Sequence, residues 1–201
     1  MDADAVEIRV LGCLIEKQRT TPDVYPLSLN SLRLACNQST NREPVVAYEE
    51  AEIRAALGRL DQRRWARLAS GPGSRAAKYR HLLDEALGLD GAELSLLALL
   101  MLRGPQTPGE LKQRSERLFA FESTAHVEEQ LERLAGRELV VRLERRPGQK
   151  EERWAQLLGG TAAPETTSQP APGASTLEAR VAALERDVAE LKAGLPVRDR
   201  A

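Results

Sequence analysis

Basic side chains crowd one stretch of this sequence, where they could contact the phosphates of a nucleic acid. The stretch contains Arg59, Arg63, Arg64, Arg67, Arg75, Lys78 and Arg80. Residues 1 to 83 hold 13 Lys or Arg against 10 Asp or Glu, a net charge of +3, whereas residues 84 to 158 hold 11 against 14, a net charge of −3. Because the whole chain has a formal charge of −1, a nucleic-acid partner is predicted from the first of these regions alone.

Acidic residues oppose this hypothesis within the same two regions. Glu49, Glu50 and Glu52 occupy the start of the predicted third helix, the part of a recognition helix that usually touches base edges. Carboxylates there repel phosphates and suit the helix dipole instead. The third helix of the second region carries Glu122, Glu128, Glu129 and Glu132. The second region is therefore interpreted as protein-facing or spacing, and an ordinary solvated surface remains the alternative for every arginine.

A polar segment, residues 37 to 44, has two interpretations. Its Asn and Gln side chains could bond adenine edges and Arg42 could bind a phosphate. The same residue types cap helices and form turns before a proline such as Pro44. If the segment only stabilises the fold, its side chains will be bonded to local backbone. Arg42 is kept as a candidate phosphate contact.

No catalytic constellation is visible in the sequence. It contains no phosphate-binding glycine loop, no HExxH and no nucleophile elbow. His81 and His126 have no Cys or second His at ligand spacing and are expected to be surface or hydrogen-bonded residues. Cys13 and Cys36 fall in apolar helical patterns, as small core residues do. We therefore predict no enzyme, no metal and no cofactor.

An internal repeat underlies residues 1 to 158. Thr21-Pro22 recurs as Thr107-Pro108 at an offset of 86, and the apolar spacing that begins at Ile53 recurs from Val127 at an offset of 74. Two copies of one unit are predicted. The fall in offset assigns about twelve extra residues to the first copy, and we place them at 37 to 48, between its second and third helices.

Each copy is predicted to form three helices followed by two short strands. Helices are expected at 5 to 18, 29 to 36 and 48 to 62, then at 92 to 103, 108 to 117 and 124 to 135; strands are expected at 65 to 69 and 78 to 82, then at 139 to 144 and 152 to 157. This order predicts a mainly α fold with small β wings, made of two tandem winged helix-turn-helix domains over 1–84 and 85–158.

The last part of the chain differs in composition. Residues 159 to 174 contain no side chain larger than Gln, which is typical of a flexible linker. Apolar residues then alternate at steps of four and three, which predicts a short coiled-coil helix over 175–195. The seam is Leu177, Val181, Leu184, Val188 and Leu191, with Leu195 at its end. We predict a homodimer through this helix, with a partner helix or disorder as the alternatives.

The sequence also resembles a known family. The residues that carry the resemblance are Leu11-Gly12-Cys13-Leu14-Ile15-Glu16-Lys17-Gln18, Thr20 to Leu32, Ala35-Cys36-Asn37-Gln38 and Asn41-Arg42-Glu43-Pro44-Val45. They are similar to the YceH family of uncharacterised bacterial proteins, and the similarity extends to Leu158. The resemblance implies two tandem winged-helix domains and no particular activity. Ser39-Thr40 and Glu43 stand where the family usually has Lys-Ser and Asp, which weakens a phosphate contact in that segment.

These features lead to one preferred function and one alternative. The longest apolar run, Leu94 to Leu102, is too short for a membrane helix and no signal peptide is visible, so a cytoplasmic protein with no membrane partner is predicted. We favour double-stranded DNA binding through the first domain, with transcriptional or chromosome-associated consequences. The alternative is a protein-interaction scaffold that uses acidic helices or exposed residues such as Phe119 and Phe121.

Overall fold

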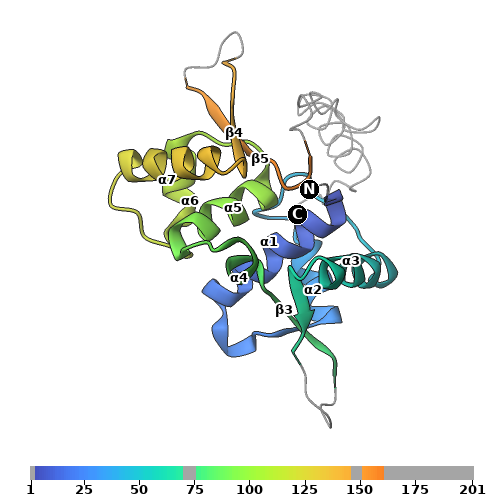
Figure 1. Ribbon diagram of the computed structural model, residues 1–201. Coiled ribbons are helices and arrows are strands. Elements are labelled where there is room, and N and C mark those ends of the chain that lie inside the picture. Colours follow the sequence, from blue (N-terminus) through green and yellow to red (C-terminus); the bar gives the residue numbers. More distant parts are fainter. Residues whose placement is uncertain (1–2, 70–75, 146–150, 161–201) are drawn as a thin grey trace, which may run out of the picture. The chain divides into compact units, whose positions relative to one another are not determined.

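A computed structural model describes residues 3–69, 76–145 and 151–160 of the chain (Figure 1). The first half of these residues combines helices with short strands. In chain order the elements are α1 (Ala5–Thr20), the 3-10 helix η1 (Pro22–Val24), β1 (Leu27–Ser28), α2 (Leu29–Cys36), α3 (Glu50–Gln62), β2 (Ala66–Leu68), β3 (Lys78–His81) and α4 (Leu83–Leu87). Helix α4 then leads into the second half.

The second half repeats the same order without the short additional elements. It contains α5 (Gly91–Arg103), α6 (Pro108–Ser115), α7 (Thr124–Gly136), β4 (Val140–Leu143) and β5 (Arg153–Gln156). Within the described residues, seven α-helices and two small antiparallel sheets make the fold mainly helical with small β elements, as the sequence predicts at this level of detail. We call the elements α1 to β3 the first repeat and α5 to β5 the second repeat.

The first helix of each repeat begins in the same way. The Asp4 side chain accepts a hydrogen bond from the Glu7 N–H, and the Glu7 side chain accepts one from the Asp4 N–H. Asp90 and Glu93 make the same reciprocal pair at the start of α5. Such capping boxes satisfy amide donors that a helix N-terminus leaves unpaired. The same local signal thus starts both repeats, 86 residues apart.

The strands of the two repeats pair in equivalent register. In the first sheet the strand order is β1-β3-β2, and Leu68 lies opposite Tyr79. In the second sheet Arg142 lies opposite Trp154 between β4 and β5. An isolated bridge between Gln106 and Trp154 takes the place of the pairing of β1 with β3. Both repeats therefore position a third helix beside a two-stranded antiparallel pair.

The two repeats share one hydrophobic core, centred on the contact between α1 and α5. The helices approach closely because Gly12 has no side chain, and a Cβ added there would lie 2.9 Å from Leu102 Cδ2. Every residue of α5 from Ala92 to Leu102 is buried. Two backbone hydrogen bonds also join the repeats, from Glu43 N to Leu102 O and from Ala3 N to Leu158 O. The repeats accordingly lie within one compact unit, Met1–Ala162.

The helix N-caps correct the placement of the extra residues in the first repeat. Ser28 caps α2 and Thr107 caps α6, at an offset of 79, while Glu49 and Ser123 precede α3 and α7 at an offset of 74. Seven of the twelve extra residues therefore precede α2, and only five lie between the second and third helices. The prediction that all twelve lie at 37 to 48 is wrong, because Thr107-Pro108 begins a helix whereas Thr21-Pro22 leads into η1.

Three short elements are absent from the sequence predictions. They are η1, β1 and α4, none longer than five residues. Elements this short carry too few apolar positions to show a period, which explains why the sequence did not reveal them. Helix α4 spans the predicted boundary at residues 84 and 85, and the division into two domains stays a prediction.

Candidate nucleic-acid interface

Two of the predicted phosphate contacts, Arg59 and Arg63, bind the start of α1. Both project from the end of α3 toward the buried carboxylate of Glu7, with each Nε 3.3 Å from a Glu7 oxygen. Arg59 also pairs with Asp4 at 2.5 Å. Although burial opposes ionisation of Asp4, the Glu7 N–H and the Arg59 guanidinium together hold the pKa of that carboxyl below its usual value. These contacts connect α3 to α1.

The second repeat contains the same arrangement, which we call the clamp: a buried glutamate of the first helix bound by two arginines at the end of the third helix. Glu93 on α5 is buried and lies 3.3 Å from Arg133 Nη2 and 3.5 Å from Arg137 Nη1, both contributed by the end of α7. Arg133 also lies 3.7 Å from Asp90. Because the arrangement recurs in a repeat whose third helix is acidic, fixing α3 on α1 is sufficient to explain Arg59 and Arg63. Their side chains are still 41% and 34% exposed, so part of each guanidinium remains accessible.

Arg64 follows α3 in the left-handed backbone conformation, with φ of 58°. The Trp65 N–H donates to the Leu60 carbonyl across it, which closes the helix end. Glu138 takes the same conformation, with φ of 55°, after α7. Arg64 is exposed, and no ion-pair partner for it is found among the described residues. The turn therefore presents this guanidinium to solvent.

Arg67 and Arg80 face each other across β2 and β3. Like charges directly opposite each other in an antiparallel pair destabilise a sheet. Arg80 also pairs with Glu85 at 2.9 Å, whereas the described residues provide no ion-pair partner for Arg67. The equivalent pair in the second repeat is Val141 opposite Ala155. The first repeat thus tolerates an unfavourable charge pair where the second repeat has apolar side chains.

The remaining predicted cations are found in different environments. Lys78 lies in β3 and is exposed, and Arg75 falls outside the described residues. Arg42 is buried and makes two hydrogen bonds to Glu16, at 2.6 and 3.1 Å, and one to the Ala35 carbonyl at 3.0 Å. Against the effect of burial, the Arg42 guanidinium keeps the pKa of Glu16 below its usual value. Arg42 therefore has no route to a phosphate in this conformation.

Asn37 and Arg42 of the polar segment 37–44 are bonded to their surroundings, whereas Ser39 and Thr40 are exposed. The Asn37 side chain accepts from the Tyr48 N–H and donates to the Tyr48 carbonyl, both at 2.9 Å. The buried Arg9 donates to the carbonyls of Cys36 and Pro44, at 3.1 and 2.6 Å. These bonds fit the structural interpretation of the segment, in which it holds the connection between α2 and α3 against α1.

Both cysteines and one histidine are buried beneath this surface. Cys13 and Cys36 are free thiols in the core, and the neighbouring Cys13 together with burial raises the pKa of Cys36. His81 Nε2 lies 2.7 Å from Gln18 Oε1, and burial lowers the pKa of His81 to about 4. The Tyr25 hydroxyl accepts from the His81 N–H, and burial raises the pKa of Tyr25 to about 12. At neutral pH His81 and Tyr25 are uncharged, and the contact of His81 with Gln18 holds β3 against α1.

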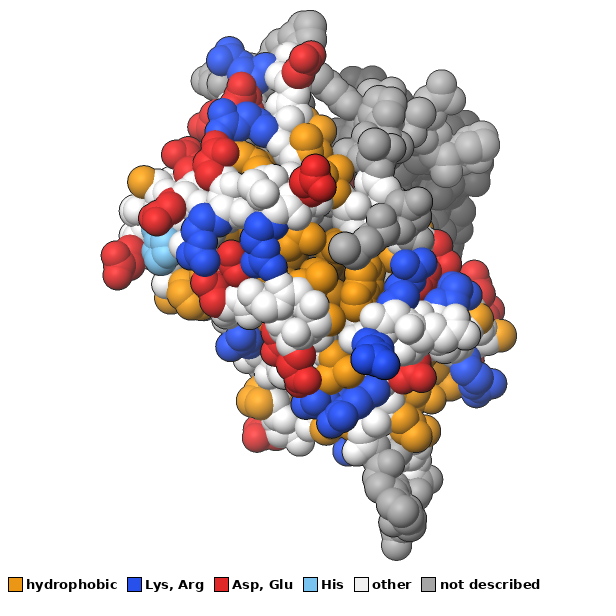
Figure 2. All heavy atoms as spheres, viewed as in Figure 1, with side chains coloured by type: hydrophobic (Ala, Val, Ile, Leu, Met, Phe, Trp, Pro, Cys, Tyr) orange, Lys and Arg blue, Asp and Glu red, His pale blue; other side chains and the backbone are white. Residues whose placement is uncertain are grey.

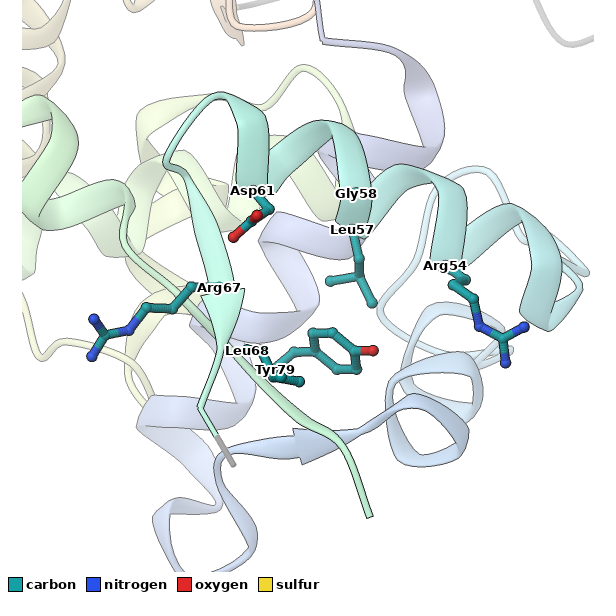
Figure 3. Close-up of a pocket in the computed structure, with 7 residues that line it drawn as sticks. All are labelled: Arg54, Leu57, Gly58, Asp61, Arg67, Leu68 and Tyr79. Atoms are coloured by element: carbon teal, nitrogen blue, oxygen red, sulfur yellow. The ribbon is translucent and has the colours of Figure 1, made fainter. Parts of the chain in front are cut away.

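A notch of about 300 Å³ lies between α3 and the β2–β3 pair. Its lining residues are Arg54, Leu57, Gly58, Asp61, Arg67, Leu68 and Tyr79. Figure 3 shows Leu57, Leu68 and the Tyr79 ring together in the middle, with Arg54 and Arg67 extending from opposite sides. Arg54 lies outside the basic stretch identified in the sequence, and only the fold brings it to one surface with Arg67.

The equivalent space in the second repeat carries the opposite charge. A cavity of about 790 Å³ between α7 and the β4–β5 pair is lined by Glu128, Glu129, Glu132, Glu151 and Glu152 among others. Arg142 pairs there with Glu132 and with Glu152, and its guanidinium lies 4.9 Å from the Trp154 ring centre. In Figure 2, acidic and basic side chains alternate around this repeat, whereas basic side chains gather beside the strands of the first.

The sequence analysis did not identify Glu7 and Glu93, the two buried glutamates that bind the arginines. A signal was present, because an Asp-x-x-Glu box recurs at an offset of 86 and an Arg-x-x-x-Arg pair recurs at an offset of 74. The predicted seam from Leu177 to Leu191 lies outside the described residues. Phe121 is buried and Phe119 partly buried, with ring centres 4.8 Å apart, so neither stands out as a docking residue.

Within the described part of the chain, no helix combines the length and the apolarity needed to cross a membrane. A family model described as "Protein of unknown function, DUF480" matches residues 3–149. A UPF0502 protein of Azotobacter vinelandii is 53% identical over 156 residues, which cover 78% of this chain and 69% of that protein. A UPF0502 protein of Geobacter sulfurreducens is 50% identical over 194 residues, 92% of this chain and 88% of the relative. The resemblance identified from the sequence is thereby confirmed at the level of the family.

Proposed function

The chain belongs to the DUF480 family, and from the geometry of its first repeat we propose that it binds duplex DNA without catalysis. In this proposal each repeat is a winged helix, α3 is the recognition helix and the β2–β3 pair is the wing. Domains 1–84 and 85–158, the linker 159–174 and a dimer formed through the helix 175–195 complete the predicted architecture. A dimer would raise the affinity of two weak basic surfaces through effective concentration.

The observation that carries the proposal is the pair of like charges at Arg67 and Arg80. Its repulsion is relieved when a phosphate lies between or above the two guanidinium groups. Arg64 adds an exposed cation at the end of α3, and Lys78 lies in the same strand as Arg80. In this proposal Arg64, Arg67 and Arg80 replace Arg42, Arg59 and Arg63 as the main phosphate contacts. Arg42 is buried on Glu16, and Arg59 and Arg63 hold the buried Glu7. The carboxylate that pairs with Arg80, that of Glu85, is itself exposed.

A salt series with mixed-sequence duplex DNA tests the proposal. In the variant, Arg64, Arg67 and Arg80 are changed to Gln. Removing one cation that neutralises a phosphate reduces the slope of log affinity against log salt by about 0.9, so we expect a slope smaller by roughly 3 and at least about tenfold weaker binding at low salt. No DNA binding by the unmodified chain at low salt would overturn the proposal.

A matched variant controls for net charge. Changing Lys112, Arg117 and Arg145 to Gln removes three cations from the second repeat instead. We expect this variant to retain most of the affinity and nearly the full salt slope of the unmodified chain. Equal losses of affinity in the two triple variants would show that binding follows total charge and not the surface of α3 and its wing.

A protein partner is the second candidate function, and the acidic surface of the second repeat favours it. Glu128, Glu129 and Glu132 stand at the positions that Arg54, Ala55 and Gly58 occupy in the first repeat. Carboxylates at these positions exclude a phosphate backbone and suit a basic protein surface. In a chain with no DNA affinity, this surface would be the first place to look for a partner.

A further inference from the structure

The notch between α3 and the β2–β3 pair combines an apolar middle with charged ends. Leu68 is 53% exposed, lies opposite Tyr79 in the sheet and forms the apolar part with it and Leu57. Contact between an exposed aliphatic side chain and water is unfavourable, so a ligand that covers Leu68 gains free energy. A ligand that lies here must therefore offer an apolar surface flanked by negative charge.

The notch is open on its helical side because of Gly58. A Cβ added to Gly58 would meet no atom within 4 Å, so a side chain there would project into free space. Arg54 is 66% exposed, and its ion pair with Glu50 is long, at 3.8 Å. Arg67 lines the other end, where its guanidinium points away from Leu68 and Tyr79 in Figure 3. Both guanidinium groups can therefore turn toward a ligand at little cost.

A nucleic-acid strand alternates phosphate, sugar and phosphate, which is the pattern that this notch complements. We propose that one strand of the duplex backbone lies in the notch, with a deoxyribose against Leu68 and Tyr79 and the phosphates on either side paired with Arg54 and Arg67. This inference rests on the proposed function and specifies its contacts. It makes the exposed leucine part of the binding surface and accounts for a glycine within a helix, where glycine costs stability.

A substitution at Asp61 is expected to strengthen DNA binding, unlike the other substitutions in the notch. Its carboxylate also lines the notch and repels a phosphate placed there. Replacing it with the neutral amide should therefore strengthen binding. A substitution that tightens the complex is informative, because damage to the fold would weaken it instead.

The second repeat carries charged side chains at the positions equivalent to Gly58 and Leu68. Glu132 stands where Gly58 stands, and Arg142 stands where Leu68 stands. Arg142 lies over the Trp154 ring and pairs with Glu132, so one ion pair joins the third helix to the strands at the edge of the larger cavity there. A longer side chain at position 58 of the first repeat should likewise stand between α3 and the strands, and it would occupy part of the smaller notch there.

The test measures DNA affinity and hydroxyl-radical cleavage of the bound duplex with the full chain. Gly58→Gln should weaken binding about tenfold and reduce the salt slope by roughly two, because the strand can then reach neither Arg54 nor Arg67. It should also abolish protection of one sugar position while other protections remain. Leu68→Ser should weaken binding severalfold with the slope unchanged, and Asp61→Asn should tighten it severalfold.

Val24→Ser is the matched control, since Val24 is 59% exposed but lies outside the notch. We expect its affinity to equal that of the unmodified chain. DNA binding that depends on Arg64, Arg67 and Arg80 but is unchanged by Gly58→Gln and Asp61→Asn would overturn this inference and leave the proposed function standing. Absence of DNA binding by the unmodified chain would overturn both.

Discussion

The two repeats share their internal contacts and differ in their outer surfaces. Each fixes its third helix to its first through one buried glutamate and two arginines, with Glu7 in one repeat and Glu93 in the other. On the surface beside the strands, Arg67 faces Arg80 in the first repeat, whereas the second repeat has apolar side chains at the equivalent pair. Residues present in both repeats therefore stabilise the fold, and residues present in one indicate what that repeat binds.

The clamp itself gives the largest expected effect. Glu7→Gln and Glu93→Gln each leave two arginines beside a neutral amide. Removing one partner of a buried ion pair costs roughly 3–5 kcal/mol. We expect each variant to lose free energy of unfolding near the lower end of this range, because the arginines are partly exposed. Urea denaturation of both variants measures the loss. A large loss from one and none from the other would break the equivalence of the two clamps.

Acid sensitivity should distinguish the repeats. His81 of β3 has its pKa lowered from 6.5 to about 4 by burial, and Gln156 occupies the equivalent position in β5. Between these pH values the unfolded chain binds a proton on His81 and the folded chain does not. The free energy of unfolding should therefore fall by at most about 3 kcal/mol as pH falls from 6.5 to 4.

The control replaces the histidine with its counterpart from the other repeat. In His81→Gln the fall between pH 6.5 and pH 4 should be much smaller, and the loss that remains should set in at lower pH, where Asp4 and Glu16 are protonated. Thermal denaturation across this pH range measures both chains. Identical profiles would show that His81 is not the group that responds.

The contact between the repeats should be sensitive to side-chain volume. Gly12→Val places methyl groups against Leu102 and Met101, where even a Cβ would lie 2.9 to 3.1 Å from their atoms. We expect about 2 kcal/mol of destabilisation from overpacking. Gly58→Ala, in open space on α3, should be neutral or stabilising when measured by the same denaturation experiment.

The smallest expected effect is a gain in stability. Arg64→Gly and Glu138→Gly each relieve a left-handed backbone conformation and should stabilise the protein by up to about 1 kcal/mol. Only Arg64→Gly should also weaken DNA binding, since only Arg64 belongs to the proposed surface. Denaturation and the salt series together separate the two effects, and a stabilised Arg64 variant with undiminished affinity would remove Arg64 from that surface.

Helices were predicted more accurately from the sequence than were the residues that connect them. The bounds of α2 are those predicted, and the other predicted helices of the two repeats agree within two residues at each end. Their apolar periods are local properties of the chain. The extra residues before α2 were assigned elsewhere, because Thr21-Pro22 and Thr107-Pro108 share letters but not structure. A dipeptide match cannot reveal which residue caps the following helix.

The candidate site was only partly accessible from the sequence. The basic stretch was visible, but Arg42 is buried on Glu16, and Arg59 binds carboxylates at the start of α1. Whether an arginine faces solvent or a carboxylate depends on contacts between residues far apart in the chain. Arg54 and Leu68 became candidate binding residues only when the fold placed them at one notch.

The burial of α5 on all sides has a consequence for how the protein opens. From Ala92 to Leu102 the helix is covered by elements of both repeats, so its amide hydrogens are reached by solvent only when the shared core separates. Hydrogen exchange along α5 should then report the global unfolding free energy, and amides at the exposed strand ends should exchange far sooner. Because this helix lies beneath both surfaces, we expect the two repeats to unfold as a single cooperative unit.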